Sequence, residues 1–184
     1  MVESSSITLP DKIFFCGVPG SRWSSIAREL KNSGDYNLSD RASHRGYKHH
    51  GSQGHLESYF GTGMEFPCDL SEDNLLAPFT EPTKCKLLLS HEWAYNLEEI
   101  VFKYPDDWIM LIYRENWASF LWWKKAGGFK ITYPNYGWYE SDYLMTKRIE
   151  EQNDLILTFA QSHNLSWKQH PKHKDIFITT YKYD

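Results

Sequence analysis

The amino-acid sequence predicts a three-layer α/β/α domain in which a mainly parallel β-sheet lies between helices. Short apolar runs of strand length alternate along the chain with stretches of helical periodicity. This alternation is typical of parallel sheets that are covered on both faces. The chain has 184 residues, a length that favours one core over two thin ones. We therefore expect a single α/β domain over residues 1–184.

The first unit of this fold is predicted to be a strand, a tight turn and a helix. Residues 12–18 form an apolar run that leads into a Gly-Val-Pro-Gly turn, which is typical of a buried strand. Residues 21–30 follow, with Trp23, Ile26 and Leu30 at helical spacing. The chain therefore opens as strand, loop and helix.

The later elements repeat this alternation. Apolar runs predict strands over residues 86–90, 108–113 and 175–183, and helical periodicity predicts helices over residues 94–102, 116–126 and 140–162. Residues 1–11 are polar and rich in serine, so we expect a loose N-terminal arm. Residues 40–66 are rich in glycine, histidine and basic side chains, which predicts an irregular loop on the substrate side.

The composition argues against several classes of function. Lys plus Arg number 20 and Asp plus Glu number 24, a formal net charge of −4 that disfavours broad nucleic-acid binding. The 3 cysteines are widely spaced, which disfavours a zinc knuckle or a disulfide scaffold. No apolar stretch has the length of a membrane span, and the N-terminus lacks a signal-peptide pattern. We therefore expect a reduced cytoplasmic protein that binds neither nucleic acid nor membrane.

Three segments place chemically active side chains at the carboxyl ends of predicted strands, where α/β sheets bind ligands. The first is the turn that contains Pro19, Gly20, Ser21, Arg22, Trp23, Ser24 and Ser25. Backbone amides, a helix start, serine hydroxyls and an arginine all favour phosphate binding. An ordinary strand–helix turn with a serine cap is the alternative. The ATP- and GTP-binding pattern Gly-x-x-x-x-Gly-Lys-Ser/Thr is absent, together with its lysine.

The other two segments supply a histidine and an arginine. His91 directly follows the strand predicted over residues 86–90, where it is placed to act as a general base. The alternative is a histidine that hydrogen-bonds a neighbouring loop. Arg114 follows the next strand and is suited to clamp an anion, with Ser119 in the helix after it. The alternative here is a surface pair of Arg114 with Glu115, and a solvent-facing Ser119.

In this order the three segments resemble the PAPS-dependent sulfotransferase family. Residues 18–24 are similar to the family's Tyr-Pro-Lys-Ser-Gly-Thr-Thr-Trp loop, which binds the 5′-phosphosulfate of PAPS. Residues 90–93 resemble its Thr-His-Leu-Pro segment, which carries the catalytic histidine, and residues 113–119 resemble its Arg-Asn-Pro-x-Asp…Ser segment, which binds the 3′-phosphate. The resemblance covers three short blocks between residues 13 and 123 and is nearest to the small sulfotransferase-like proteins of phages and bacteria.

This resemblance implies a P-loop NTPase-like (sulfotransferase) topology and the transfer of a sulfuryl group from PAPS to a hydroxyl or amine. The acceptor is a carbohydrate or a small molecule, the product is PAP, and no metal is needed. His91 takes the acceptor's proton, the turn over residues 19–25 holds the phosphosulfate, and Arg114 with Ser119 holds the 3′-phosphate. The loop residues expected to contact the acceptor are Arg41, Arg45, His49, His50 and His55.

The sequence also departs from the family pattern. The family's lysine falls on Gly20, and Arg22 is the candidate replacement for its charge. Ser119 follows Arg114 by five residues rather than eight, and the late Arg-Lys-Gly block of the family is missing. PAPS is then held more weakly than in the family, or a second copy of the chain in a homo-oligomer completes its site.

Three alternatives remain open. The four histidines between residues 44 and 55 are a candidate metal site, although no histidine–carboxylate pair at helical spacing supports it. A P-loop small-molecule kinase needs Mg²⁺ ligands, for which Asp106 and Asp107 are candidates. A non-catalytic carbohydrate-binding or assembly protein on the same fold is favoured by the missing lysine and the missing late block.

Overall fold

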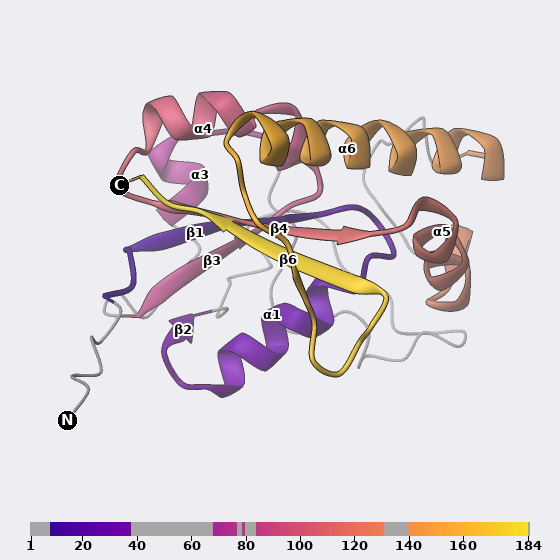
Figure 1. Ribbon diagram of the computed structural model, residues 1–184, viewed down its shortest axis with the longest axis horizontal. Helices are drawn as coiled ribbons and strands as arrows, with labels where there is room; N and C mark the ends of the chain where they lie inside the picture. The colour runs from indigo at the N-terminus through magenta and orange to yellow at the C-terminus, as the bar shows by residue number, and fades with distance from the viewer. Residues whose placement is uncertain (1–7, 38–67, 77–78, 80–83, 131–139, 184) are drawn as a thin grey trace.

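The computed structural model of the chain describes residues 8–37, 68–76, 79, 84–130 and 140–183. It has three layers, with a twisted sheet between helices on either side (Figure 1). The prediction of an α/β fold with a mainly parallel sheet is therefore confirmed.

The sheet has 6 strands in the order β2-β3-β1-β4-β6-β5. The strands are β1 (Lys12–Gly17), β2 (Tyr36–Asn37), β3 (Cys85–Leu89), β4 (Trp108–Arg114), β5 (Lys168–Gln169) and β6 (Ile176–Tyr181). The first four strands in this order pair in parallel, whereas β6 runs antiparallel to β4 and β5 runs antiparallel to β6. Strand β1 therefore lies inside a parallel core that an antiparallel hairpin extends on one side.

The helices divide between the two faces of the sheet (Figure 1). Helix α1 covers one face, and α4 and α6 cover the other, with α5 beyond the end of β4. The bounds are α1 (Trp23–Asn32), α3 (Glu72–Leu76), α4 (Leu97–Lys103), α5 (Asn116–Lys125) and α6 (Asp142–Ser162), with short 3₁₀ turns η2 (Glu92–Tyr95) and η3 (Gly128–Lys130). The connection after β1 thus leaves the sheet on the α1 face. The connections after β3 and β4, the two neighbours of β1, leave it on the opposite face.

The core consists of two apolar clusters, one on each face of the sheet. Phe14 of β1 packs in the cluster that contains Ile149 and Ile156 of α6. The adjacent residues Ile13 and Phe15 pack in the other cluster, against α1. Because successive side chains of a strand point to opposite faces, both sets are buried and β1 is apolar from Ile13 onward. This burial explains why the strand appears in the sequence as an uninterrupted apolar run.

Several short elements were not predicted from the sequence. Strands β2 and β5 have 2 residues each, and helix α3 has 5. The segment predicted as one helix over residues 94–102 begins instead with η2 and continues as α4. The N-terminal arm is described only from residue 8, and there Leu9 packs against the α1-side core.

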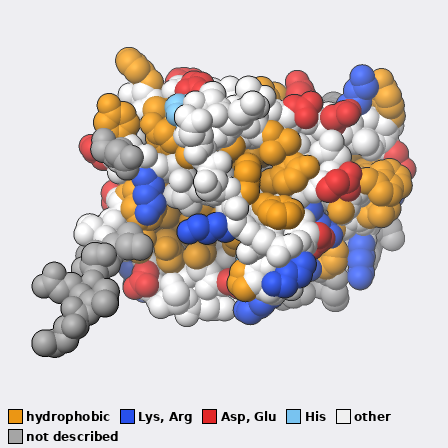
Figure 2. Space-filling view, in the orientation of Figure 1, with side chains coloured by type: hydrophobic (Ala, Val, Ile, Leu, Met, Phe, Trp, Pro, Cys, Tyr) orange, Lys and Arg blue, Asp and Glu red, His pale blue; other side chains and the backbone are white. Residues whose placement is uncertain are grey.

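The described surface in the view of Figure 2 mixes acidic, basic and apolar side chains over the whole face. Among the described residues, no helix combines the length and apolar character that crossing a membrane requires.

Candidate functional site

The candidate site lies at the edge of the sheet where the parallel strands have their carboxyl ends. Strand β1 ends at Gly17, β3 at Leu89 and β4 at Arg114. The chain leaves β1 toward the α1 face and leaves β3 toward the opposite face, where Trp93 and Leu97 are buried. A crevice at such a switch point is where open α/β sheets bind ligands. The three predicted segments therefore meet at one edge.

The turn between β1 and α1 presents the start of a helix to this edge. The Ser21 amide donates to the carbonyl of Val18 at 3.0 Å and closes the turn. Arg22 is the N-cap residue, with φ of 66°. A left-handed conformation costs a non-glycine residue about 1–2 kcal/mol, and an arginine side chain has no acceptor to cap helix amides. Since the first turn of α1 also lacks acidic residues, its partial positive charge is not offset there.

Gly20 lies directly against helix α5. Its φ is 81°, and a Cβ at this position would overlap the backbone carbonyl of Ser119 and approach the Cβ of Trp123 to 3.0 Å. Both the backbone conformation and the contact require glycine. The lysine that the sulfotransferase family carries at this point is therefore incompatible with this packing.

Ser21 contributes a buried hydroxyl. Its side chain is fully buried, and its Oγ has no hydrogen-bond partner within the described part of the chain. The Oγ points back into the turn, since a Cβ on Gly17 would lie 2.8 Å from it. Buried hydroxyls are nearly always satisfied, so this one beside a helix start is a candidate to bind a ligand, an ion or a water.

Arg114 joins the end of β4 to two other segments. Its Nε and Nη2 donate to Oδ2 of Asp175 at 2.8 and 2.6 Å, and its Nη1 donates to the carbonyl of Gly20 at 3.1 Å. The partner is Asp175 and not Glu115, whose carboxylate instead caps helix α5 through the amides of Trp117 and Ala118. The alternative of a surface pair between Arg114 and Glu115 is therefore wrong.

Ser119 faces the interior of the protein. It is fully buried, and its Oγ donates to the carbonyl of Arg114 at 3.2 Å. The solvent-facing alternative is therefore wrong. The hydroxyl helps to hold the start of α5 against the end of β4.

His91 follows β3 and is 1% exposed. Its Nδ1 lies 2.7 Å from the side-chain nitrogen of Gln152, which is fully buried on α6. The next residue, Asn153, donates to the carbonyl of Arg114 at 2.9 Å. Helix α6 thus passes over the ends of β3 and β4. Its adjacent side-chain amides, those of Gln152 and Asn153, contact one strand end each. Neighbouring polar residues at core positions of an amphipathic helix are a signal that a search for such residues would have found.

The indole ring of Trp122 makes cation–π contacts with three basic side chains of the site. Its ring lies 4.2 Å from the guanidinium of Arg22, 5.4 Å from the ammonium of Lys125 and 5.6 Å from the guanidinium of Arg114. Cation–π contacts of this kind hold cations close to one another. Three cationic side chains therefore lie around one indole at this edge of the sheet, although the chain as a whole is acidic.

The structure brings some of the predicted residues together and not others. Arg114 touches the turn at Gly20, and it shares Trp122 with Arg22. Trp23, Ser24 and Ser25 form the first turn of α1, beside the turn residue Pro19. His91 lies at the neighbouring strand end, with its described side-chain contact to α6. The predicted acceptor residues Arg41, Arg45, His49, His50 and His55 lie outside the described residues.

In the described part of the chain no group of three His, Cys, Asp or Glu side chains is placed to hold a metal ion, and the four histidines of the candidate metal site between residues 44 and 55 lie outside that part. Asp107 lies just before β4, where it pairs with Lys12 at 2.5 Å. That is the amino edge of the parallel strands, opposite the turn between β1 and α1. Asp106 and Asp107, the two carboxylates that kept the kinase alternative open, both precede β4 and therefore lie at the edge away from the candidate site.

No protein-family model, no curated protein and no solved structure matches this chain.

Proposed function

We propose that this chain is a PAPS-dependent sulfotransferase that transfers a sulfuryl group to a hydroxyl or amine of a carbohydrate or small-molecule acceptor. The observation that carries the proposal is the meeting of an uncapped helix start, a buried serine hydroxyl and an arginine at one switch point of the sheet. Amides, a hydroxyl and guanidinium groups together recognise phosphate and sulfuryl oxygens.

The strand order supports a P-loop NTPase-like topology, which we propose for the parallel part of the sheet. Strand β1 is central, its turn leads directly into α1, and β3 and β4 lie on either side of it. In this arrangement the turn after the central strand holds the phosphosulfate. The antiparallel pair β6 and β5 is an addition at the edge.

The residues of the turn have distinct roles in this proposal. The first amides of α1 and the Oγ of Ser21 bind the phosphosulfate, and Arg22 supplies the positive charge that Gly20 cannot carry. Fixed donors of this kind stabilise charge that develops on the sulfuryl and bridging oxygens during transfer. Arg114 binds the 3′-phosphate, for which its present partner Asp175 has to move away.

His91 is the proposed general base. The acceptor oxygen or nitrogen bonds to sulfur, the bond from sulfur to the bridging oxygen breaks, and PAP leaves with that oxygen. The acceptor's proton passes to Nε2 of His91. The ring then needs a proton on Nδ1, which the oxygen of the Gln152 amide accepts after a half turn of that amide. Gln152 is thus a positioning residue for His91.

One observation favours the non-catalytic alternative, a carbohydrate-binding or assembly protein on the same fold. A base has to reach its proton, and His91 is 1% exposed in this structure. In that alternative the contact between His91 and Gln152 only packs α6 onto the sheet. Binding of PAP without any sulfuryl transfer to a panel of sugars and phenols would favour it.

Calorimetric titration with PAP tests the proposal on the wild-type chain and on Ser21→Ala. The variant removes a hydroxyl that has no described partner, so folding stability should not fall. Loss of a hydrogen bond to a charged ligand should weaken PAP binding about tenfold. Ser33→Ala, at the other end of α1, is the matched control and should bind as the wild type does.

Three results would contradict the proposal. One is the absence of PAP binding by the wild-type chain at millimolar concentration, and another is equal affinity for PAP and for ATP with Mg²⁺. The third is unchanged PAP affinity in Ser21→Ala, which would remove the serine from the phosphosulfate site.

A further inference from the structure

The sheet register places an acidic residue against Arg114. Strands β4 and β6 pair antiparallel, with Arg114 opposite Ile176. Asp175, just before Ile176, then lies beside the arginine, and its Oδ2 accepts from both Nε and Nη2 at 2.8 and 2.6 Å. The Asp175 side chain is 50% exposed, whereas that of Arg114 is 10% exposed. The carboxylate therefore approaches a buried guanidinium from the solvent side.

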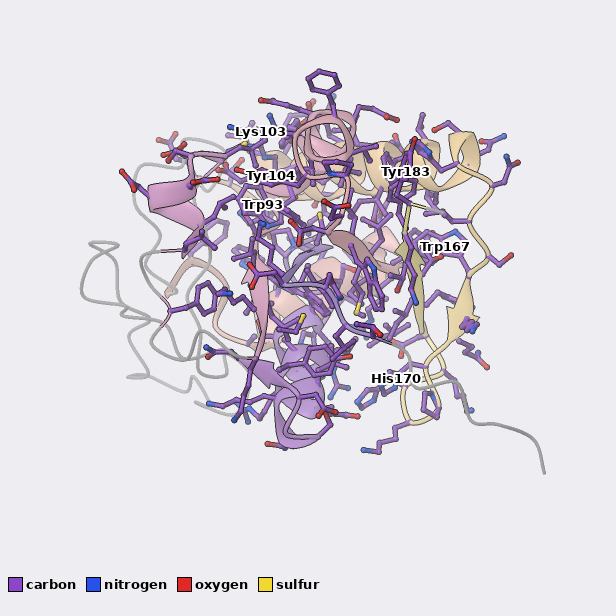
Figure 3. All side chains as sticks on the ribbon, turned by 90° about the vertical axis from the view of Figure 1, so that its left-hand side faces the viewer. Trp93, Lys103, Tyr104, Trp167, His170 and Tyr183 are labelled. Carbon is purple, nitrogen blue, oxygen red and sulfur yellow. The ribbon has the colours of Figure 1, made fainter. Side chains whose placement is uncertain are left out.

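The turn that carries Asp175 is held to α1 by a second set of charges. Between β5 and β6 the chain comes down beside α1, and His170 is labelled there in Figure 3. Glu29 of α1 lies 3.1 Å from Nζ of Lys172 and 3.7 Å from Nε2 of His170. Nδ1 of His170 accepts from the amides of Lys172 and His173, so the neutral ring carries its proton on Nε2, toward Glu29. A backbone hydrogen bond from the His170 amide to the Ile176 carbonyl closes this turn, and the ion pairs with Glu29 attach it to α1.

Asp175 lies in an electropositive environment. Burial alone would raise its pKa, but the hydrogen bond and charge of Arg114, with a contribution from Arg22, hold the pKa below its ordinary value of 3.8. The same Arg22 acts, after burial, to lower the pKa of His173. The guanidinium groups of Arg114 and Arg22 therefore both favour the ionised form of this half-exposed carboxylate.

A carboxylate bound to a guanidinium fork occupies the position that a phosphate oxygen pair would take. We propose that Asp175 is an internal anion that occupies Arg114 until a ligand phosphate displaces it, and that it thereby restricts the site to doubly charged phosphate esters. This inference rests on the proposed function, because it names the ligand class that Arg114 selects.

The selection follows from competition within one chain. A tethered carboxylate is present at an effective concentration of the order of millimolar, so a ligand has to bind Arg114 better than one carboxylate does. A phosphate monoester carries nearly two charges at neutral pH and gains more from Arg114 and Arg22 together. A single carboxylate on a ligand gains no more than Asp175 already does. Monoanions are therefore excluded and phosphate esters are admitted.

The test titrates three forms of the chain, the wild type and two variants, with each of three probes: PAP, inorganic phosphate and acetate. The two variants are Asp175→Asn and Asp154→Asn. Asp154→Asn is the control, because it also removes one acidic side chain, from the exposed face of α6. We expect Asp175→Asn to bind PAP and phosphate about threefold more tightly and to gain acetate binding. Asp154→Asn should match the wild type. Equal affinities for all three variants would overturn the inference.

A second measurement uses the unaltered chain and so does not depend on how the variant folds. Carbon-13 NMR follows the Asp175 carboxyl during a pH titration, without ligand and with saturating PAP. Displacement from Arg114 should raise the pKa of Asp175 toward or above its ordinary value. An unchanged pKa in the PAP complex would show that the carboxylate stays on Arg114, which overturns the inference.

The two proposals fail in different ways. Tighter phosphate binding by Asp175→Asn without any binding of PAP supports the internal anion and contradicts the sulfotransferase. PAP binding by the wild type with no gain in Asp175→Asn supports the nucleotide site and contradicts the internal anion. No binding of any probe to any variant contradicts both.

Discussion

Gly20, in the turn after β1, is in direct backbone contact with Ser119, in the first turn of α5. The left-handed conformation of Gly20 and the position of the Ser119 carbonyl leave no room for a side chain. Arg114 completes this contact, since it donates to the carbonyl of Gly20 and accepts at its own carbonyl from Ser119. The turn is therefore positioned by α5 and β4, and not only by its own sequence.

This contact predicts that Gly20→Ala is much more destabilising than an alanine at a comparable glycine. Gly34 also has a positive φ, of 96°, but nothing lies within 4 Å of its Cβ position. Gly34→Ala should cost only the backbone strain, about 1 kcal/mol, whereas Gly20→Ala adds about 1–3 kcal/mol for the overlap. Urea unfolding of both variants measures the difference in their free energies of unfolding. An equal loss of free energy in the two variants would show that the turn can shift away from α5 to make room for the side chain.

The contact between His91 and Gln152 predicts a specific pattern of turnover. Gln152→Met removes both the donor and the acceptor, so PAPS turnover should fall at least about tenfold. Gln152→Glu keeps an acceptor for the Nδ1 proton and should retain turnover. Nitrogen-15 NMR of the His91 ring in both variants reports which nitrogen carries the proton. Full turnover in Gln152→Met would remove Gln152 from the mechanism.

The ion pair of Asp175 with Arg114 predicts a pH dependence of stability. Because the pKa of Asp175 is lower in the folded chain than its ordinary value of 3.8, the folded state favours the ionised form. The stabilisation is present above that ordinary value and is lost as pH falls below it. Because Asp175 is half exposed, the pair is worth less than about 1 kcal/mol.

The measurement for this pH dependence is urea unfolding of the wild type and Asp175→Asn from pH 6 down to pH 2.5. The wild type should be the more stable above pH 5, and the difference should vanish at the acidic end. A difference that stays constant over the range would mean that the carboxylate charge contributes nothing.

The long elements of the fold were predictable because burial of their side chains produces apolar runs or helical periodicity within a short stretch of sequence. Strands β1 and β3 are buried on both faces and β4 is buried on one face and half-buried on the other, so each contains an apolar run of at least three residues. Strands β2 and β5 have 2 residues each, too few for any periodicity to show. Their pairing depends on neighbours that lie far away in the sequence.

The candidate site was predictable only in part, for the same reason. The turn, His91 and Arg114 follow apolar runs, so their position at one edge follows from the parallel sheet. Asp175 lies 61 residues from Arg114 and meets it only through the register of β6. Gln152 is likewise 61 residues from His91 and reaches it because α6 crosses the strand ends. Asp175 carries no local signal of its own, whereas Gln152 and Asn153 are adjacent polar residues at core positions of α6, a pattern that the sequence analysis did not use.

The most direct test of the central claim is the melting temperature of the wild-type chain with PAP, PAPS, sulfate or ATP with Mg²⁺. A ligand that binds only the folded state stabilises it by about 2.7 kcal/mol at a hundredfold excess over its Kd, which is a shift of several degrees for a chain of this size. The account predicts such a shift with PAP and PAPS and a smaller one with ATP and Mg²⁺. No shift with millimolar PAP or PAPS would contradict the account and leave a binding or assembly role for this fold.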